Sequence, residues 1–569
     1  METETTPAAS EPRASISSRL ADLWRATKPA LPFVASFLFL DLLLNLRYPA
    51  PEPPLWYLVP SVDVVVLFFY FGVFGWNGWK VPAAVRVALV VLLFVVRVIR
   101  IGDGVQQRFF FQVFNAYTDL PVVPELVRFA RSTLPAWEFW LLAIGAVLGV
   151  ALVAYAAYRS LASAERYLSN TRNIRNAGIA TGLLFVILSS LPDDPGWRDL
   201  YFGGFAASAF PRVRHEAKFL MNVYGYSAEK IQVIRAAQER LARVPSNLAK
   251  LHRANVYLIF VESYGQTVFE QPLFIERIRP NADAFEREVT EHGFTLASGV
   301  LDSPTYGGQS WLAHVTLSTG IHTSDQLQYE LDCAESPKTI AQFFHAAGYH
   351  TTLVQPGTTR DWPKGEFYGF DTKFYAWNFD YQGPRFAWST MPDQYVLDFL
   401  RRAEVSKRPA PFFIEYVLVT SHAPWSHQPI MVDDWSRIGD GSIYQTLEMV
   451  RYPITWPDFT DASEAYIRSI SYDLDVLRRY LVDYLNDDSL VVILGDHQPV
   501  REVTDYSEHR GVPVHVLSRD PALVQPFVAR GYTKGMWPVI DEPHDSLENF
   551  LAELLEDFSD PPSAPPPVR

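Results

Sequence analysis

Residues 255–265, NVYLIFVESYG, combine a buried strand with a carboxylate at its end. The run Val256–Val261 has the length of a strand and is apolar throughout, as expected for a strand covered on both faces. Glu262 follows at once, so a negative charge stands where the strand leaves the core. A charge in such a place needs a partner from elsewhere in the chain.

Further apolar runs of strand length follow this one, at His350–Val354, Phe412–Val419, Leu490–Leu494 and Val512–Leu517. Amphipathic patterns of helical period lie between them, for example at Thr339–Ala347 and Ala462–Leu485. This alternation predicts an α/β domain with a mostly parallel central sheet and helices on both faces. In such a sheet, functional side chains gather beyond the carboxyl ends of the strands.

Polar side chains do follow the expected strands. His422 comes after the third one, in VLVTSHAPW, and Asp496 and His497 come after the fourth, in VVILGDHQP. Carboxylates and an imidazole suit a borderline-hard divalent ion, so Glu262, Asp496 and His497 are candidate metal ligands. Taken singly, Glu262 could cap a turn and the Asp-His pair could be an ordinary turn. Their common place at strand ends favours the metal site.

A candidate nucleophile stands in SPTYGGQSWLAHVTLSTG, residues 303–320. Gly307 and Gly308 allow a tight turn, and Ser310 then opens a short helix expected over Trp311–Leu317. Ser310 could simply cap this helix by accepting a backbone N–H. It could also be a nucleophile, since a helix N-terminus and a metal ion both stabilise an alkoxide. The motif alone leaves both interpretations open.

In this order, FVESYG, GGQS with LSTG, TSHAPW and LGDHQP resemble the alkaline phosphatase and sulfatase superfamily. The similarity is greatest to lipoteichoic acid synthases and to phosphoglycerol transferases of periplasmic glucans, over about residues 30–540. The resemblance implies one divalent cation, Mn²⁺, Mg²⁺ or Zn²⁺, held by Glu262, Ser310, Asp496 and His497. It implies further that Ser310 is the nucleophile and that His422 contacts the transferred phosphoryl group.

The chain departs from that family around the nucleophile. It has GGQS where many relatives have GGTS, and counting back from Gly320 places Ser310, not Gln309, on the nucleophile. His314 stands where relatives often carry a glutamate. That change would alter either the acceptor or only the packing.

The resemblance also suggests substrate contacts outside the metal site. GTTRDWPKGEFYGFDTKF, residues 357–374, is loosely similar to a substrate-contacting loop, so Arg360, Trp362 and Lys364 are candidate phosphate contacts; an exposed turn of mixed charge is the alternative. In EHRGVPVHV, His509 is a further candidate substrate contact. His515 lies within the expected strand and is interpreted as a packed core residue.

The first two hundred residues carry the long apolar runs of a membrane domain. Candidate membrane helices, each needing roughly 20 residues to cross a bilayer, are Ala30–Leu46, Tyr57–Trp76, Val81–Ile99, Phe139–Tyr158 and Gly178–Leu191. Lys and Arg in the short flanking segments place the N-terminus in the cytoplasm and, with five helices, the large domain outside it. With four helices the large domain would instead be cytosolic.

The sequence therefore divides into five parts. They are a polar tail (1–28), a membrane domain of about five helices (29–193), a connector with a helix around Ser227–Val244 (194–250), a sulfatase-like catalytic domain (251–556) and a Pro-rich tail (557–569).

Composition excludes several classes of function. The net charge of −14 gives no basic field for nucleic acid, and the one cysteine, Cys333, allows neither an internal disulfide nor a CxxC metal site. Neither Cys333 nor Ser310 has the C-x-P-S-R type context of a formylglycine sulfatase, which favours phosphoryl over sulfate chemistry.

The family resemblance then implies a transferase of the bacterial inner membrane with a periplasmic catalytic domain. It would move phosphoglycerol or phosphoethanolamine from a phospholipid donor, through a phospho-serine, to a glycan or lipid acceptor. A phosphodiesterase, phosphatase or other hydrolase of the same fold is the alternative, and a non-catalytic binding protein is a further one.

Overall fold

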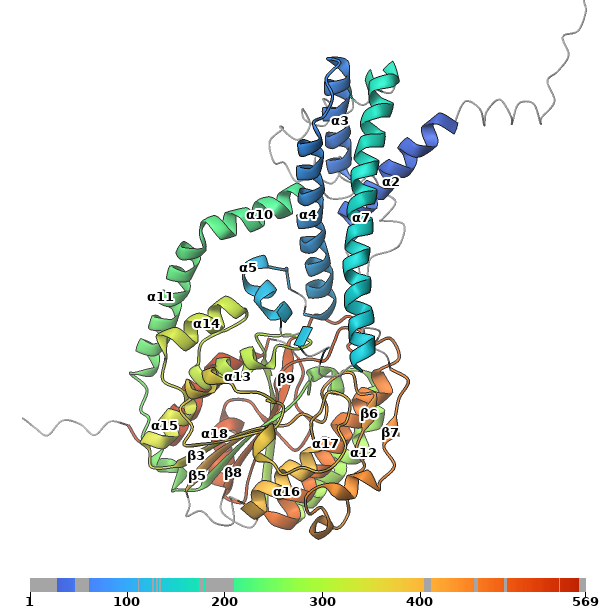
Figure 1. The fold of residues 1–569 in the computed structure, drawn as a ribbon. Coiled ribbons are helices and arrows are strands. Elements are labelled where there is room, and N and C mark those ends of the chain that lie inside the picture. Colours follow the sequence, from blue (N-terminus) through green and yellow to red (C-terminus); the bar gives the residue numbers. More distant parts are fainter. Residues whose placement is uncertain are drawn as a thin grey trace, which may run out of the picture. The chain divides into compact units, whose positions relative to one another are not determined.

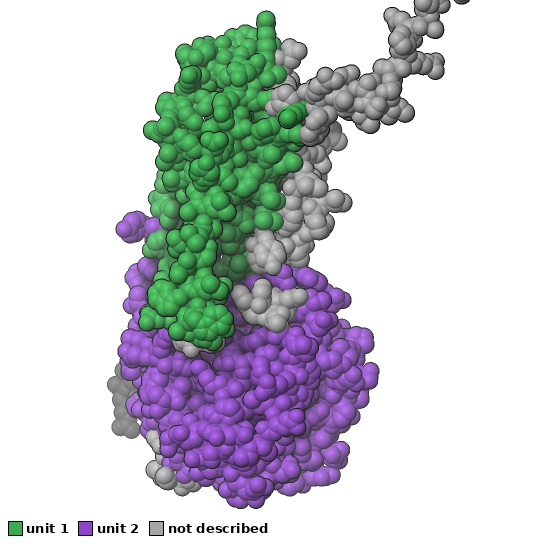
Figure 2. Space-filling model, turned by 45° about the vertical axis from the view of Figure 1, so that its right-hand side comes forward, with its two compact units in different colours: residues 1–107, 113–221 green, residues 108–112, 222–569 purple. Residues whose placement is uncertain are grey.

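The structure, a computed structural model, forms two compact units, coloured separately in Figure 2. The first comprises residues 1–107 and 113–221, and the second comprises 108–112 and 222–569. The boundary at 221 falls within the expected connector 194–250. The described residues are 28–46, 61–110, 112–124, 127–128, 131, 135–172, 175–176, 179–180, 209–403, 411–454, 459–485, 489–541 and 543–561.

The first unit is helical. Its longer helices are α2 (Leu31–Asn45), α3 (Val62–Trp76), α4 (Ala83–Phe109), α7 (Ala136–Asn170) and α10 (Ala209–Met221), with the short α5 (Ala116–Asp119) between α4 and α7. Both α2 and α3 pack on α7, through a core that includes Leu40, Phe68 and Leu161.

These helices match four of the five expected membrane segments in position, and α4 continues further than expected, to Phe109. Among the described residues, α7 is the one helix both long and apolar enough to cross a membrane, while α2 and α3 are apolar but shorter. Large apolar side chains on α7 are exposed, with Val147 69% and Leu152 68% accessible. The fifth expected segment, Gly178–Leu191, lies outside the described residues except for positions 179 and 180.

The second unit is built on a mixed sheet in the order β10-β2-β9-β8-β1-β5-β3-β4, with β11 pairing beside β2 (Figure 1). The strands are β1 (Asn255–Val261), β2 (Thr295–Asp302), β3 (His350–Gln355), β4 (Thr372–Tyr375), β5 (Phe412–Val417), β8 (Ser489–Gly495), β9 (Gly511–Ser518), β10 (Thr533–Lys534) and β11 (Asp545–Ser546). A separate small sheet pairs β6 (His427–Gln428) with β7 (Val450–Arg451).

The sheet is parallel from β8 to β4, as the alternation of strands and helices predicts. The five predicted strands correspond to β1, β3, β5, β8 and β9, each within two residues at its ends. The exception to the expected direction is β9, which runs antiparallel to both β8 and β2. The sequence pattern did not predict β2.

Helices cover both faces of this sheet (Figure 1). On one face lie α12 (Pro272–Glu291), α16 (Asp393–Ala403) and α17 (Ser463–Tyr484). The other carries α13 (Ser310–Thr319), α15 (Ile340–Ala346), α18 (Pro521–Ala529) and α19 (Phe550–Phe558). The remaining helices of the unit are α11 (Val223–Leu241) and α14 (Gln326–Glu335).

The larger core lies under α13 and α15, where Phe344 stacks on Phe413 with ring centroids 4.3 Å apart. The helix α15 begins at a capping box, in which Thr339 and Gln342 exchange side-chain and backbone hydrogen bonds. The predicted helices 339–347 and 462–485 correspond to α15 and α17, each within one residue at its ends.

Candidate metal and nucleophile site

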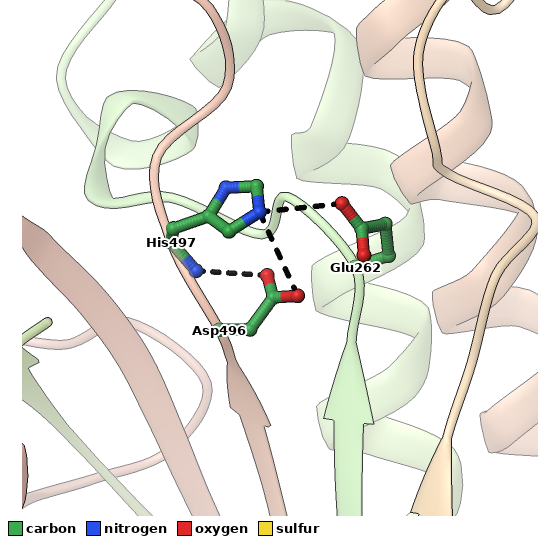
Figure 3. Close-up of side chains that lie close together, drawn as sticks. All are labelled: Glu262, Asp496 and His497. Carbon is green, nitrogen blue, oxygen red and sulfur yellow. Dashed lines mark hydrogen bonds and ion pairs between the residues drawn. The ribbon is translucent and has the colours of Figure 1, made fainter. Parts of the chain in front are cut away.

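The register of two neighbouring strands brings the three candidate ligands together. In the parallel pair β1 and β8, Val261 lies opposite Gly495, so that Glu262 and Asp496 leave the same edge of the sheet side by side. All three side chains are buried, with Glu262 5%, Asp496 0% and His497 1% exposed. One ligand atom from each lies within 4.8 Å of the others, and Figure 3 shows the three converging.

The donor set fits a divalent cation. His497 Nε2 lies 3.4 Å from Glu262 Oε1 and 3.8 Å from Asp496 Oδ2. Asp496 Oδ2 is buried without a hydrogen-bond partner. His497 Nδ1 lies 2.7 Å from the Gln498 carbonyl oxygen, and a proton held there leaves Nε2 free to bind a metal. Two carboxylates and an imidazole at this spacing suit Zn²⁺ or Mn²⁺, and a Mg²⁺ ion would use the oxygens.

Glu262, Asp496 and His497, here called the triad, influence one another's ionisation strongly. Burial raises the pKa of Asp496, and the neighbouring Glu262 carboxylate raises it further. For His497, burial favours the neutral ring, but Asp496 and Glu262 outweigh it and the pKa rises. Burial acts against ionisation of Glu262 too, yet His422 and His497 hold its pKa well below the usual range. The triad is thus a buried anionic site that favours a positive charge.

Ser310 faces this triad. Its Oγ donates to Glu262 Oε2 at 3.1 Å and lies 3.1 Å from His497 Nε2. Ser310 is the first residue of α13, and Gln309 occupies the N-cap position. The alternative interpretation of Ser310 as the helix cap is therefore wrong, and its hydroxyl points at the candidate metal ligands.

The local backbone explains how the serine reaches that position. Gly307, Gly308 and Gln309 all have positive φ angles, of 69°, 145° and 63°, which turn the chain sharply before α13. The Gly307 N–H donates to the Gln498 carbonyl at 3.0 Å, so the turn is tied to the segment that carries His497.

The turn after β5 is held to the same edge. Ser421 Oγ donates to the Glu262 carbonyl at 2.7 Å, which places the neighbouring His422 beside the end of β1. The His422 ring stacks on Trp388 at 5.1 Å, and it is close enough to Glu262 to lower the pKa of that carboxyl. His422 is half-buried, so one side of it is accessible to a substrate.

The other predicted residues lie in different surroundings. Trp362 packs near Tyr368 with ring centroids 5.5 Å apart, and Lys364 forms an ion pair with Glu330. His509 pairs with Glu270 at 2.6 Å. Arg360 is exposed. None of these contacts of Trp362, Lys364 and His509 involves Glu262, Asp496 or His497.

His515 is fully buried, as expected of a core residue. Its ring nitrogens lie 2.9 Å from the Tyr264 hydroxyl and 2.7 Å from Ser298 Oγ.

Sequence reasoning missed a pair of buried carboxylates behind the His422 turn. Asp393 accepts from the backbone N–H groups of Val419 and Thr420, and it fixes the segment leading to His422. Asp473 is buried near it, and burial raises the pKa of both carboxyl groups. Both residues lie in amphipathic helices, where an acidic residue carries no signal of its burial.

Comparison with known proteins finds one family model and several solved structures that resemble this chain. Residues 255–531 match the family model of sulfatases. The structure is similar to lipoteichoic acid synthase LtaP from Listeria monocytogenes, with 15% identity, TM-score 0.34, and coverage of 53% of this chain and 72% of that one. It is also similar to the phosphoglycerol transferase GacH of Streptococcus pyogenes, with 14% identity, TM-score 0.35, and coverage of 58% and 91%.

A third similar structure is the C-terminal periplasmic domain of EptC from Escherichia coli. It has 16% identity and a TM-score of 0.33, with 52% of this chain and 80% of that one covered. No curated protein matches the sequence significantly.

Proposed function

We propose that this chain, whose residues 255–531 match the family model of sulfatases, is a membrane-anchored, metal-dependent phosphotransferase. It would move a phospholipid-derived headgroup, phosphoglycerol or phosphoethanolamine, to an extracytoplasmic glycan or lipid acceptor. The observation that carries this proposal is the position of Ser310 Oγ, 3.1 Å from both Glu262 and His497.

Glu262, Ser310, Asp496 and His497 would hold the cation, which when bound supplies Lewis-acid stabilisation of negative charge. Ser310 is aimed by its hydrogen bond to Glu262, so that an Oγ lone pair can face a phosphorus atom. As Oγ attacks, the Ser310 hydroxyl would release its proton to solvent. The Oγ–P bond would form as the bond from phosphorus to the diacylglycerol oxygen breaks, leaving a phospho-serine.

His422 would supply the proton that the leaving diacylglycerol oxygen needs. Its position beside the end of β1, on an accessible turn, suits this role of general acid. In the second step the acceptor hydroxyl would attack phosphorus and His422 would take its proton. The P–Oγ bond would break, and Ser310 Oγ would regain a proton from solvent. Water in place of the acceptor would make the same first step a hydrolysis.

Anchoring fits a donor that resides in a bilayer. The exposed apolar surface of α7 would hold the chain in the bacterial inner membrane, and the catalytic domain would lie on the periplasmic side. Tethering keeps the lipid headgroup at a high effective concentration near Ser310.

The test uses the full chain in vesicles that contain a tail-labelled phospholipid and Mn²⁺. Wild type should release labelled diacylglycerol and become labelled at Ser310 by a phosphorus-labelled donor. Ser310→Ala should lower diacylglycerol release at least about a thousandfold, as expected for loss of a nucleophile. Ser436→Ala, at an exposed serine, is the matched control. Activity retained in Ser310→Ala would refute the assignment.

A further inference from the structure

A small cavity lies beside the nucleophile, between α13 and the strands β3 and β5. Its volume is about 10 Å³. The polar and aromatic residues that line it are Trp311, His314, Gln355, Trp362, Tyr368 and Glu415. Trp311 directly follows Ser310, and His314 lies one helical turn further along α13.

Glu415 is the unusual member of this lining. It lies within the buried strand β5, is 2% exposed, and its Oε2 has no hydrogen-bond partner. Burial raises the pKa of Glu415 to about 8. No cation among the described residues offsets this effect. In the ligand-free protein Glu415 is therefore mostly protonated at pH 7, and its ionised form becomes favourable only when a positive charge joins it.

The other walls of the cavity favour a cation. Trp311, Trp362 and Tyr368 are aromatic, and the face of an aromatic ring attracts positive charge. Trp311 is fixed by a hydrogen bond from its Nε1 to Gln326 Oε1, at 3.1 Å. Trp362 packs near Tyr368 at 5.5 Å. Aromatic rings around an acidic group that lacks a partner would suit a cationic ligand.

His314 adds an acceptor. It is 5% exposed and its Nε2 is buried without a partner. Burial lowers the pKa of His314 to about 4, so the ring is neutral at pH 7 and one of its nitrogens can accept a hydrogen bond.

The size of the cavity selects the cation. About 10 Å³ of space accommodates one group of the size of a water molecule. A primary ammonium has that size and three N–H donors to give to Glu415 and His314. A trimethylammonium group and the diol of glycerol are larger, and the diol has no positive charge for Glu415.

The cavity also lies at a suitable distance from the nucleophile. His314 lies four positions after Ser310, a rise of roughly 6 Å along the helix. The O–C–C bridge between the phosphorus and the ammonium of phosphoethanolamine spans a comparable length. A headgroup with its phosphorus at Ser310 can therefore reach the cavity with its nitrogen.

We propose that this cavity binds the primary ammonium of an ethanolamine headgroup, with Glu415 as its counter-ion. The donor is then a phosphatidylethanolamine-type lipid and the transferred group is phosphoethanolamine. This inference rests on the proposed function, since it assigns the headgroup that Ser310 receives.

The first experiment compares donors. The full chain, in vesicles with Mn²⁺, is given tail-labelled phosphatidylethanolamine, phosphatidylglycerol or phosphatidylcholine, and labelled diacylglycerol is measured. We expect phosphatidylethanolamine to be turned over at least about tenfold faster than either of the others, the ratio that one charged contact provides. Equal turnover, or a preference for phosphatidylglycerol, overturns the inference and leaves the proposed function intact.

The second experiment measures binding and needs no turnover. Calorimetry on the full chain with Mn²⁺ compares O-phosphoethanolamine, phosphocholine and glycerol phosphate. O-phosphoethanolamine should bind about tenfold more tightly than the other two. Glu415→Gln should remove this preference, and Glu366→Gln, the same change at an exposed carboxylate, should keep it. Equal binding of all three by wild type overturns the inference even if no lipid is turned over.

A stability measurement separates this role from a structural one. At pH 7 Glu415 is ionised in the unfolded chain but must hold a proton in the fold, which destabilises the folded state. Glu415→Gln removes this cost without changing shape, so the ligand-free variant should unfold at a higher temperature than wild type. A variant that is more stable and yet has lost its headgroup preference supports a binding role. A lower unfolding temperature identifies Glu415 as structural and contradicts the proposal.

Discussion

The role of the Ser310 hydroxyl depends on whether this residue is the N-cap of α13 or the first residue of the helix. As the N-cap it would accept a backbone N–H, but Gln309 holds that position and Ser310 is the first helical residue. Its Oγ is therefore available to Glu262 and His497, both at 3.1 Å. Positive φ angles at residues 307–309 produce this shift. The glycines in the sequence indicated a turn, while the left-handed Gln309 had no sequence signal.

His422→Ala tests the general acid. We expect the rate with a phospholipid donor to fall about 10² to 10⁴-fold, because diacylglycerol leaves poorly without a proton. A nitrophenyl phosphodiester, whose leaving group needs no proton, should lose much less. Comparing the two substrates in steady-state assays checks this. An equal loss with both substrates would assign His422 to binding rather than to proton transfer.

The affinity of the triad for a metal should depend on pH. In the metal-free protein the pKa values of Asp496 and His497 are both raised, so these groups hold protons that a cation must displace. Apparent affinity should therefore fall as the pH is lowered from 8 to 6, by up to about tenfold per unit for each proton released.

Titration of Mn²⁺ into the full chain, in buffers of different ionisation enthalpy, counts these protons. Asp496→Asn should bind the metal more weakly and release fewer of them. Affinity that does not change with pH would show that the triad is not the binding site.

At the scale of elements, the site depends on the pairing of β1 with β8. Both strands were predictable because each is an apolar run in the sequence. The position of Glu262, Asp496 and His497 was predictable because these polar residues follow the runs directly. The strand β2, TLASGVLD, was missed because Ser298 and Gly299 interrupt its apolar pattern. The reversed direction of β9 was missed because direction depends on the connection and not on composition. The formation of β2 and the direction of β9 depend on tertiary contacts that the local sequence does not specify.

The surroundings of Glu415 could not be predicted from the sequence pattern of its strand. In FFIEYV it is one charge within a buried run, and the apolar neighbours were enough to predict a strand. Which helix faces it, and whether a cation pairs with it, depends on α13 and β3, which lie far away in the sequence. The sequence therefore indicated the candidate metal site and not the cavity.

The packing of α15 on the sheet can be tested by Phe344→Ala. Phe344 is fully buried and stacks on Phe413 of β5 with the ring planes 10° apart. Removing the ring should lower the free energy of unfolding by about 3–5 kcal/mol. Denaturant unfolding of the full chain, followed through catalytic-domain tryptophans, measures this. Phe374→Ala, on the edge strand β4 and less buried, should have a smaller effect.

At the scale of the whole molecule, the exposed apolar side chains of α7 predict stable insertion in a bilayer. The full chain should remain with vesicles after alkaline washing. A double change, Val147→Asp and Leu152→Asp, places charges in the apolar stretch, each unfavourable by about 2.5–3.5 kcal/mol at the centre of a membrane helix. It should shift protein to the soluble fraction or block insertion.

A matched variant distinguishes charge from damage to the helix. Val147→Leu and Leu152→Ile keep the apolar surface and should keep the protein with the vesicles. Retention of the double aspartate variant in alkali-washed vesicles would show that α7 alone does not hold the chain in the bilayer.

The adjacency of β1 and β8 also has a consequence for biosynthesis. Glu262 is made long before Asp496 and His497, and the two strands that carry them are neighbours only once β8 exists. A growing chain thus has no completed site to load while most of the domain is still being synthesised. If the proposed site binds a metal, its uptake would be a late step of maturation, and a chain released early would lack the site.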